Sequence, residues 1–182
     1  AFTRVPVFTN YHRWVGCTIG ADGNKYDPDS ERILQNAINN GFSMRHDAFG
    51  MKHYYMEWEK GFISARKYTV PVLAEGGWVK TSHGGSIKSD GYANYAEVRQ
   101  GEYEDAAAAC VNMMDLRYNS DIQNSETWSW FNEGFDLMQE FLREGVYRLW
   151  PSSVSLPATA SSGSTASISA RWENAGRAYC PT

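Results

Sequence analysis

The sequence has few cysteines, no long apolar run and no cluster of basic side chains, and each absence excludes a class of protein. The three cysteines form no CxxC pair, so a zinc site of the usual spacing is not expected. No apolar stretch approaches the ~20 residues that cross a bilayer, so we expect no membrane span. The net charge of −4 and the scattered Lys and Arg argue against nucleic-acid binding, because phosphate recognition needs clustered cations.

Motifs for a bound metal or phosphate group are also missing. The glycine-rich stretch from His83 to Ser86 lacks the lysine and the following helix of a phosphate loop. No HExxH spacing occurs among the four dispersed histidines, which are His12, His46, His53 and His83. We therefore expect neither a metal nor a cofactor.

The cysteine count leaves two arrangements open. Three is an odd number, so at least one thiol is free or pairs outside the chain. A disulfide between Cys17 and Cys110 suits a secreted protein, whereas two buried thiols suit either compartment.

What the sequence does contain is enough apolar residues for a core and a regular alternation of strand and helix patterns. The chain has 182 residues, of which 42% are hydrophobic and 14% aromatic, which fits one ordinary domain. Short apolar runs predict strands at Val5–Asn10, Gly41–Asp47 and Val70–Ala74. Helical spacing predicts helices at 30–41, Tyr54–Tyr68, Glu104–Ala109 and Thr127–Glu144. The stretch from Cys110 to Met114 either continues the third helix or forms a fourth strand that ends at Asp115.

This order predicts an α/β fold, namely the second half of a (β/α)8 TIM barrel followed by the start of a β-sandwich. Strand–helix alternation implies a parallel sheet, and four βα units within residues 1–146 are half of an eightfold barrel. Residues 147–182 alternate in β fashion and form too few strands for a stable sandwich. Since a half barrel exposes edge strands and apolar faces, we expect the chain to be part of a longer polypeptide or to sit beside its other half.

The stretch from Thr69 to Trp78 is the most informative one for function. It reads as a buried strand that ends on Glu75, followed by two glycines and a tryptophan. α/β barrels place catalytic groups where such a strand meets its loop. Glu75 is therefore the candidate nucleophile, and Trp78 is a candidate for stacking on a sugar ring, with packing in the loop as its alternative role.

Other candidates follow the neighbouring strands. Asp47 is a second catalytic carboxylate, a group that binds sugar hydroxyls, or a plain loop cap. Asp115 ends the last strand and reaches the same edge, or pairs with Arg117 instead. The side chains expected to bind substrate or to keep Glu75 ionised are Tyr11, His12, Arg45 and His46.

The order of these motifs resembles a known family. VPVFTN, GFSMRHDAFGM, PVLAEGGW and AACVNMMDLRY are followed by GVYRLWPSSVSLP and GSTASISARWENAGRAYCP. This series resembles the C-terminal half of an extracellular, glycoside-hydrolase-like TIM-barrel family, which carries a domain of unknown function followed by an immunoglobulin-like β-sandwich. The likeness covers roughly Val5 to Pro181, and the closing WENAGRA element is its most specific part.

The resemblance implies a secreted protein whose four strands are barrel strands five to eight. It places Glu75 at the end of strand seven, where related retaining glycosidases carry the nucleophile, and it places their acid/base before Ala1. The chain departs from the family pattern at Asn10, His46 and Ala74, where the family has Arg, Asn and Gly.

Two other functions remain open beside a glycoside hydrolase that cleaves a polysaccharide or glycoconjugate. One is a non-catalytic carbohydrate-binding or structural extracellular protein on a degenerate barrel. The other is a small intracellular α/β domain of another kind.

Overall fold

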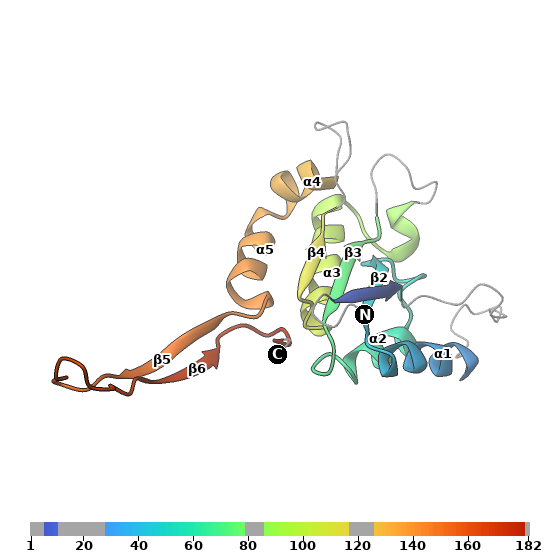
Figure 1. Cartoon of the computed structure of the whole chain (residues 1–182). Coiled ribbons are helices and arrows are strands. Elements are labelled where there is room, and N and C mark those ends of the chain that lie inside the picture. The colour runs from blue at the N-terminus through green and yellow to red at the C-terminus, as the bar shows by residue number, and fades with distance from the viewer. Residues whose placement is uncertain (1–5, 11–27, 79–85, 117–125, 181–182) are drawn as a thin grey trace.

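A computed structural model describes residues 6–10, 28–78, 86–116 and 126–180 of the chain. Its main body is a sheet of four parallel strands in the order β1-β2-β3-β4 (Figure 1). These strands are β1 (Val7–Asn10), β2 (Phe42–Phe49), β3 (Val72–Gly76) and β4 (Met113–Asp115). The expected α/β class and the parallel sheet are thus confirmed, and the alternative of a helical Cys110–Met114 segment is excluded because residues 113–115 form β4.

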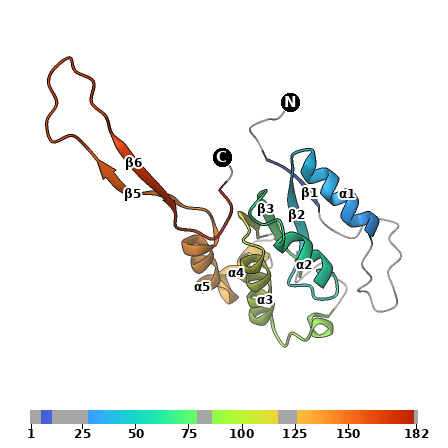
Figure 2. The same ribbon diagram turned by 90° about the horizontal axis from the view of Figure 1, so that it is seen from below.

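Helices connect the strands and lie on one side of the sheet, as the view from below makes plain (Figure 2). They are α1 (Pro28–Asn39), α2 (Glu57–Ser64) and α3 (Tyr95–Ala108), with a short 3-10 turn η1 (Ile87–Asp90) before α3. α3 begins nine residues earlier than its alanine-rich part predicts. The reason is local: the Asn94 side chain accepts a hydrogen bond of 3.0 Å from the Glu97 N–H and so caps the helix inside a stretch expected to be loop.

The core lies between the sheet and these helices. Met44, Val72 and Ala74 on the strands are almost fully buried. They belong to one cluster with Ile63 of α2 and Val98 of α3. Every second residue of a strand points to the same face, so one face of the sheet supplies this core.

The aromatic segment expected as one helix from Thr127 to Glu144 is broken. It consists of α4 (Glu126–Glu133), α5 (Phe135–Glu140) and a π-helical turn η2 (Phe141–Gly145). The break falls at Gly134, where a Cβ would lie 2.8 Å from the Trp130 ring. Trp130 is buried, whereas Phe131 and Phe135 are nearly half exposed, so the predicted apolar stripe supplies less of the core than its spacing indicates.

Residues beyond 146 form an antiparallel hairpin of β5 (Leu149–Ser155) and β6 (Ser169–Asn174), which projects away from the body (Figure 1). The pairing of Pro151 with Trp172 and of Val154 with Ala170 puts these apolar residues on one face of the hairpin. Both strands are exposed along nearly their whole length.

The base of the hairpin is held against the body. The Arg177 N–H donates to the Glu144 carbonyl at 2.8 Å, and the Asn112 side chain donates to the Tyr179 carbonyl at 2.6 Å. Gly176 lies so close to the Val146 carbonyl that there is no room for a side chain.

A buried ion pair joins α3 to the loop after β3. Arg99 Nη1 lies 2.5 Å from Glu102 Oε2, and both side chains are at most 1% exposed. Arg99 also donates to the Trp78 carbonyl at 3.1 Å, and Glu102 Oε1 accepts from the Trp78 N–H at 3.3 Å. The pair therefore fixes the backbone that follows Glu75.

We predict that Arg99→Met lowers the free energy of unfolding by about 3–5 kcal/mol, because it leaves the Glu102 carboxylate buried without its cation. Urea denaturation measures this change. The matched control is Arg177→Met, which removes the exposed pair with Glu144 and should change stability by about 1 kcal/mol or less. Equal effects of the two substitutions would contradict the anchoring role of Arg99.

Candidate functional site

The candidate site lies on the face of the sheet that the helices do not cover. The register aligns Asn10 with Arg45 and aligns Glu75 with Asp115. Since side chains alternate along a strand, Asp47, two residues after Arg45, shares the face of Arg45. Five polar side chains from four strands thus meet on one face at the carboxyl ends of the strands, where α/β folds place their sites.

Arg45 occupies the centre of this group. Its guanidinium forms an ion pair with Glu75 and lies 3.9 Å from Asp47 Oδ2. On the far side, Asn10 Nδ2 donates to the same Asp47 oxygen at 2.8 Å. The Glu75 side chain is 10% exposed, whereas Arg45 and Asp47 are about one third exposed. Arg45 stabilises the ionised form of Glu75, the state that a nucleophile needs.

Asp115 adds a third carboxylate to the row. It stands opposite Glu75 on the neighbouring strand, and it is exposed. The alternation along the strands therefore brings three of the predicted carboxylates to one face.

His46 was expected to contact substrate, and the structure places it on the opposite face. Its side chain is fully buried beneath the helices, with Nε2 3.3 Å from Glu59 Oε1. His46 Nδ1 accepts a hydrogen bond of 3.1 Å from the Ala48 N–H, so the ring proton is carried on Nε2. Because Arg45 and Asp47 flank it in a strand, His46 must point away from them, and its role is structural.

Trp78 is also not the exposed stacking surface that the sequence predicts. It is 1% exposed, and its Nε1 donates to Asp90 Oδ2 at 3.0 Å. The two glycines before it approach protein rather than ligand. A Cβ at Gly76 would lie 2.8 Å from Glu102 Oε1, and one at Gly77 would overlap Met51.

Two more predicted contacts, Tyr11 and His12, lie outside the described residues, as does Cys17. Cys110 is a buried free thiol whose Sγ lies 3.4 Å from Tyr68 Oη. Asn10 is the member of the site that the sequence reasoning missed. Its position in the sequence could have indicated this role. Asn10 ends the first predicted strand, just as Asp47 ends the second and Glu75 directly follows the third.

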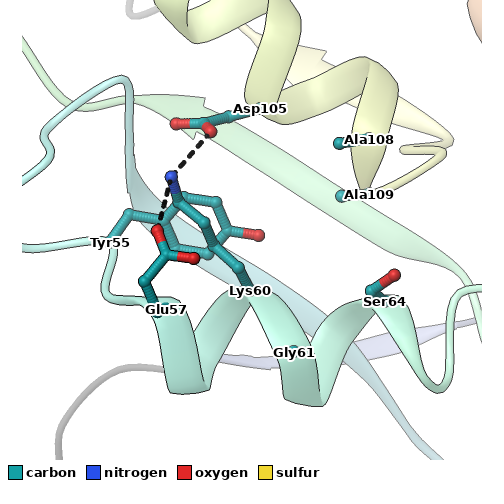
Figure 3. A pocket seen from close by; sticks show the side chains of 8 residues that line it. All are labelled: Tyr55, Glu57, Lys60, Gly61, Ser64, Asp105, Ala108 and Ala109. Atoms are coloured by element: carbon teal, nitrogen blue, oxygen red, sulfur yellow. Dashed lines mark ion pairs between the residues drawn. The ribbon is translucent and has the colours of Figure 1, made fainter.

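A pocket of about 270 Å³ lies elsewhere, between α2 and α3, and contains none of the predicted residues (Figure 3). Lys60 crosses it and lies 3.2 Å from Asp105 and 3.5 Å from Glu57. Burial raises the pKa of Asp105, an effect opposed by Lys60 and by the Gly50 N–H. Lys60 is paired with both carboxylates, so we interpret the pocket as a gap in the packing of α2 against α3 and not as a ligand site.

Among the described residues, no group of three or more His, Cys, Asp or Glu side chains is arranged to hold a metal ion. Within the same residues, no helix has the length and apolar character needed to span a bilayer. No protein-family description, curated protein or solved structure matches this chain.

The buried position of Trp78 predicts that Trp78→Phe lowers the free energy of unfolding by about 1–3 kcal/mol, because Asp90 loses one of its donors. Thermal or urea unfolding measures the change. The control is Trp172→Phe in the exposed hairpin, which should be close to neutral. Unchanged stability of Trp78→Phe would mean that the indole is not part of the packed loop.

The raised pKa of Asp105 predicts a pH-dependent effect of Lys60→Met. Since the folded protein holds the Asp105 proton more tightly than the unfolded chain, this carboxyl favours unfolding increasingly as pH rises through its folded pKa. The free energy of unfolding that the Lys60→Met variant loses, relative to the unaltered protein, should therefore grow from near zero at pH 4 to about 1 kcal/mol at pH 7. Urea unfolding across this range tests it.

The control for this experiment is Lys67→Met, since Lys67 donates to the Ala108 carbonyl and to no carboxylate. Its effect should not vary between pH 4 and 7. A Lys60→Met effect that is independent of pH would contradict the assignment.

Proposed function

We propose that this chain carries the nucleophile side of a retaining glycoside hydrolase acting on a polysaccharide or glycoconjugate. The single observation that supports the proposal is that Glu75 and Asp47, at the ends of adjacent parallel strands, share the guanidinium of Arg45. Carboxylates held together at the carboxyl edge of a parallel sheet suit the two-carboxylate chemistry of glycoside hydrolysis.

In this mechanism the Glu75 carboxylate attacks the anomeric carbon while a carboxylic acid protonates the departing glycosidic oxygen. The bond to the leaving sugar breaks, and a glycosyl ester of Glu75 forms. Water then attacks the same carbon, and the second group, now a carboxylate, takes its proton and frees Glu75. Asp47 is the proposed second carboxylate within this chain, and the family resemblance favours an acid/base from the missing half of the barrel.

The proposed surroundings of the site are a closed (β/α)8 barrel and a β-sandwich. The uncovered face of the sheet carries apolar Leu73 and Met113 below Glu75 and Asp115, as the inside of a barrel does below its mouth. The hairpin presents one apolar face, with Val154 and Trp172, which a second sheet would cover. Strands from the other half of the barrel, or from another chain, are the partners that this arrangement needs. The proposed location is extracellular, as in the family that the motifs resemble.

A carbohydrate-binding protein without hydrolysis is the second candidate, and one contact favours it. The direct ion pair between Arg45 and Glu75 lowers the nucleophilicity of the carboxylate unless substrate displaces the guanidinium. Binding without turnover would then be the activity of the same face.

We expect Glu75→Gln in the full protein to abolish release of reducing sugar from the polysaccharide that the unaltered protein cleaves, and to leave binding of that polysaccharide intact. The amide keeps the size of the side chain but cannot form the glycosyl ester. The control is Glu57→Gln, which alters a carboxylate on α2 that is 87% exposed. Full activity of Glu75→Gln would refute Glu75 as nucleophile, and binding without hydrolysis by the unaltered protein would favour the second candidate.

A further inference from the structure

A histidine and a buried carboxylate form a second polar cluster at the same edge of the sheet. His53 belongs to the loop between β2 and α2, and Asp90 ends η1. The His53 Nδ1 lies 2.8 Å from Asp90 Oδ1; the Asp90 side chain is 2% exposed and that of His53 is 44% exposed. The pair therefore joins a buried acid to a ring that reaches the surface.

The loop that carries His53 is held in place along its length. Tyr54 and Tyr55 donate through their backbone N–H groups to the Met51 carbonyl, at 2.9 and 2.8 Å. At the start of the loop, Tyr92 Oη donates to the Gly50 carbonyl at 2.9 Å. A side chain on this segment has a defined position before any ligand arrives.

Asp90 accepts hydrogen bonds from several donors at once. The Lys52 N–H and the His53 N–H donate to it at 3.0 and 3.2 Å, and Trp78 Nε1 donates at 3.0 Å. The His53 ring is the fourth partner. With its charge met by these donors, Asp90 accepts the Nδ1–H of His53 and so favours the tautomer in which Nε2 carries a lone pair.

The ring that carries this lone pair is partly exposed. Among the residues that the structure describes, no hydrogen-bonding group engages His53 Nε2. The ring is packed between Tyr54 and Trp78, with ring centres 4.7 and 5.7 Å away. Proteins use a carboxylate in this way when the second ring nitrogen has to act in a fixed orientation.

The surroundings indicate which ligand this nitrogen suits. An anion is disfavoured because the Asp90 carboxylate lies directly behind the ring. The described residues also hold no group of three or more His, Cys, Asp or Glu side chains that could bind a metal ion. A hydroxyl group donates well to a neutral imidazole nitrogen, and the partly exposed ring of Tyr54 stands beside it. A sugar offers both the hydroxyl and the apolar ring face.

The cluster also belongs to the loops that follow the strands of the proposed active site. Trp78, which touches the His53 ring, follows Glu75 by three residues, and the Gly77 N–H donates to the Phe49 carbonyl at 2.8 Å. The loops that follow β2 and β3 are therefore bonded neighbours at one edge of the sheet.

We propose that His53 forms a sugar subsite next to the cleavage site, with Nε2 accepting a hydrogen bond from a hydroxyl of the neighbouring sugar unit and Asp90 acting as its positioning residue. This inference rests on the proposed function. It differs from that function in its residues, its loop and its experimental signature.

The first test is the tautomer. In the full protein labelled with 15N, the neutral imidazole of His53 should show a protonated Nδ1 and an unprotonated Nε2. Asp90→Asn should reverse the two signals, because the amide donates to Nδ1 and forces the proton to Nε2. A native His53 with its proton on Nε2 would overturn the proposal.

The second test is binding of soluble hexasaccharides of β-1,4-glucose, α-1,4-glucose, β-1,4-xylose, β-1,4-mannose and β-1,4-N-acetylglucosamine, measured by calorimetry in the Glu75→Gln background. The sugar that binds should shift the His53 Cε1–H resonance. His53→Phe, which keeps the ring packing, should weaken binding about tenfold. His53→Gln, which can donate to Asp90 and accept from a hydroxyl, should recover part of the loss.

Lys52→Met is the control, because Lys52 Nζ lies over the Tyr92 ring and points to another neighbour. It should leave affinity unchanged, and thermal unfolding checks that every variant is folded. Should a saccharide bind with unchanged affinity in both His53 variants, the subsite is refuted while the proposed function stands. If none of the five saccharides binds, the subsite is refuted as well. Hydrolysis by the unaltered protein that survives Glu75→Gln would instead count against the proposed function alone.

Discussion

The two-residue alternation of side chains in a parallel sheet is the constraint on which the rest of this structure depends. It sends Met44, His46 and Ala74 beneath the helices and sends Arg45 and Glu75 to the open face. A shift of one residue in any strand would bury the charges and expose the core. The same rule thus specifies the apolar interior and the candidate site, and neither can change without the other.

Buried carboxylates on the helix-covered side of the sheet fix the loops that follow the strands. Glu102 accepts from the Trp78 N–H, Asp90 accepts from the Trp78 indole, and Glu59 accepts from the Met56 N–H at 2.7 Å. Each is buried, so each strongly favours the arrangement in which its hydrogen bonds are made. The loops at the edge of the sheet are therefore held by acids that do not themselves face the site.

Sequence patterns predicted the strands, their parallel order and the position of Glu75 and Asp47 at one edge of the sheet. These features depend on local apolar runs and on their spacing, which are visible in one dimension. The roles of His46 and Trp78 were wrong for a different reason. The sequence around His46 and Trp78 resembles that of surface groups, because one stands beside Asp47 and the other follows two glycines. Their buried partners, Glu59 and Asp90, lie 13 and 12 residues away in sequence, so the local pattern does not reveal them. The break at Gly134 was missed similarly, because helical spacing continues across it and only contact with Trp130 shows why a glycine stands there.

The hairpin of β5 and β6 is joined by the long segment 156–168 rather than by a tight turn, yet its base is secured where Gly176 crosses Val146 and where Asn112 holds the Tyr179 carbonyl. Closing a long segment costs conformational entropy, and the turn from Ser161 to Ser164 within it is separated from both strands by several residues. The contacts at the base hold the two strands together where the hairpin leaves the body. We therefore expect the hairpin to depend on the folded body, with its strands pairing outward from the base toward the tip.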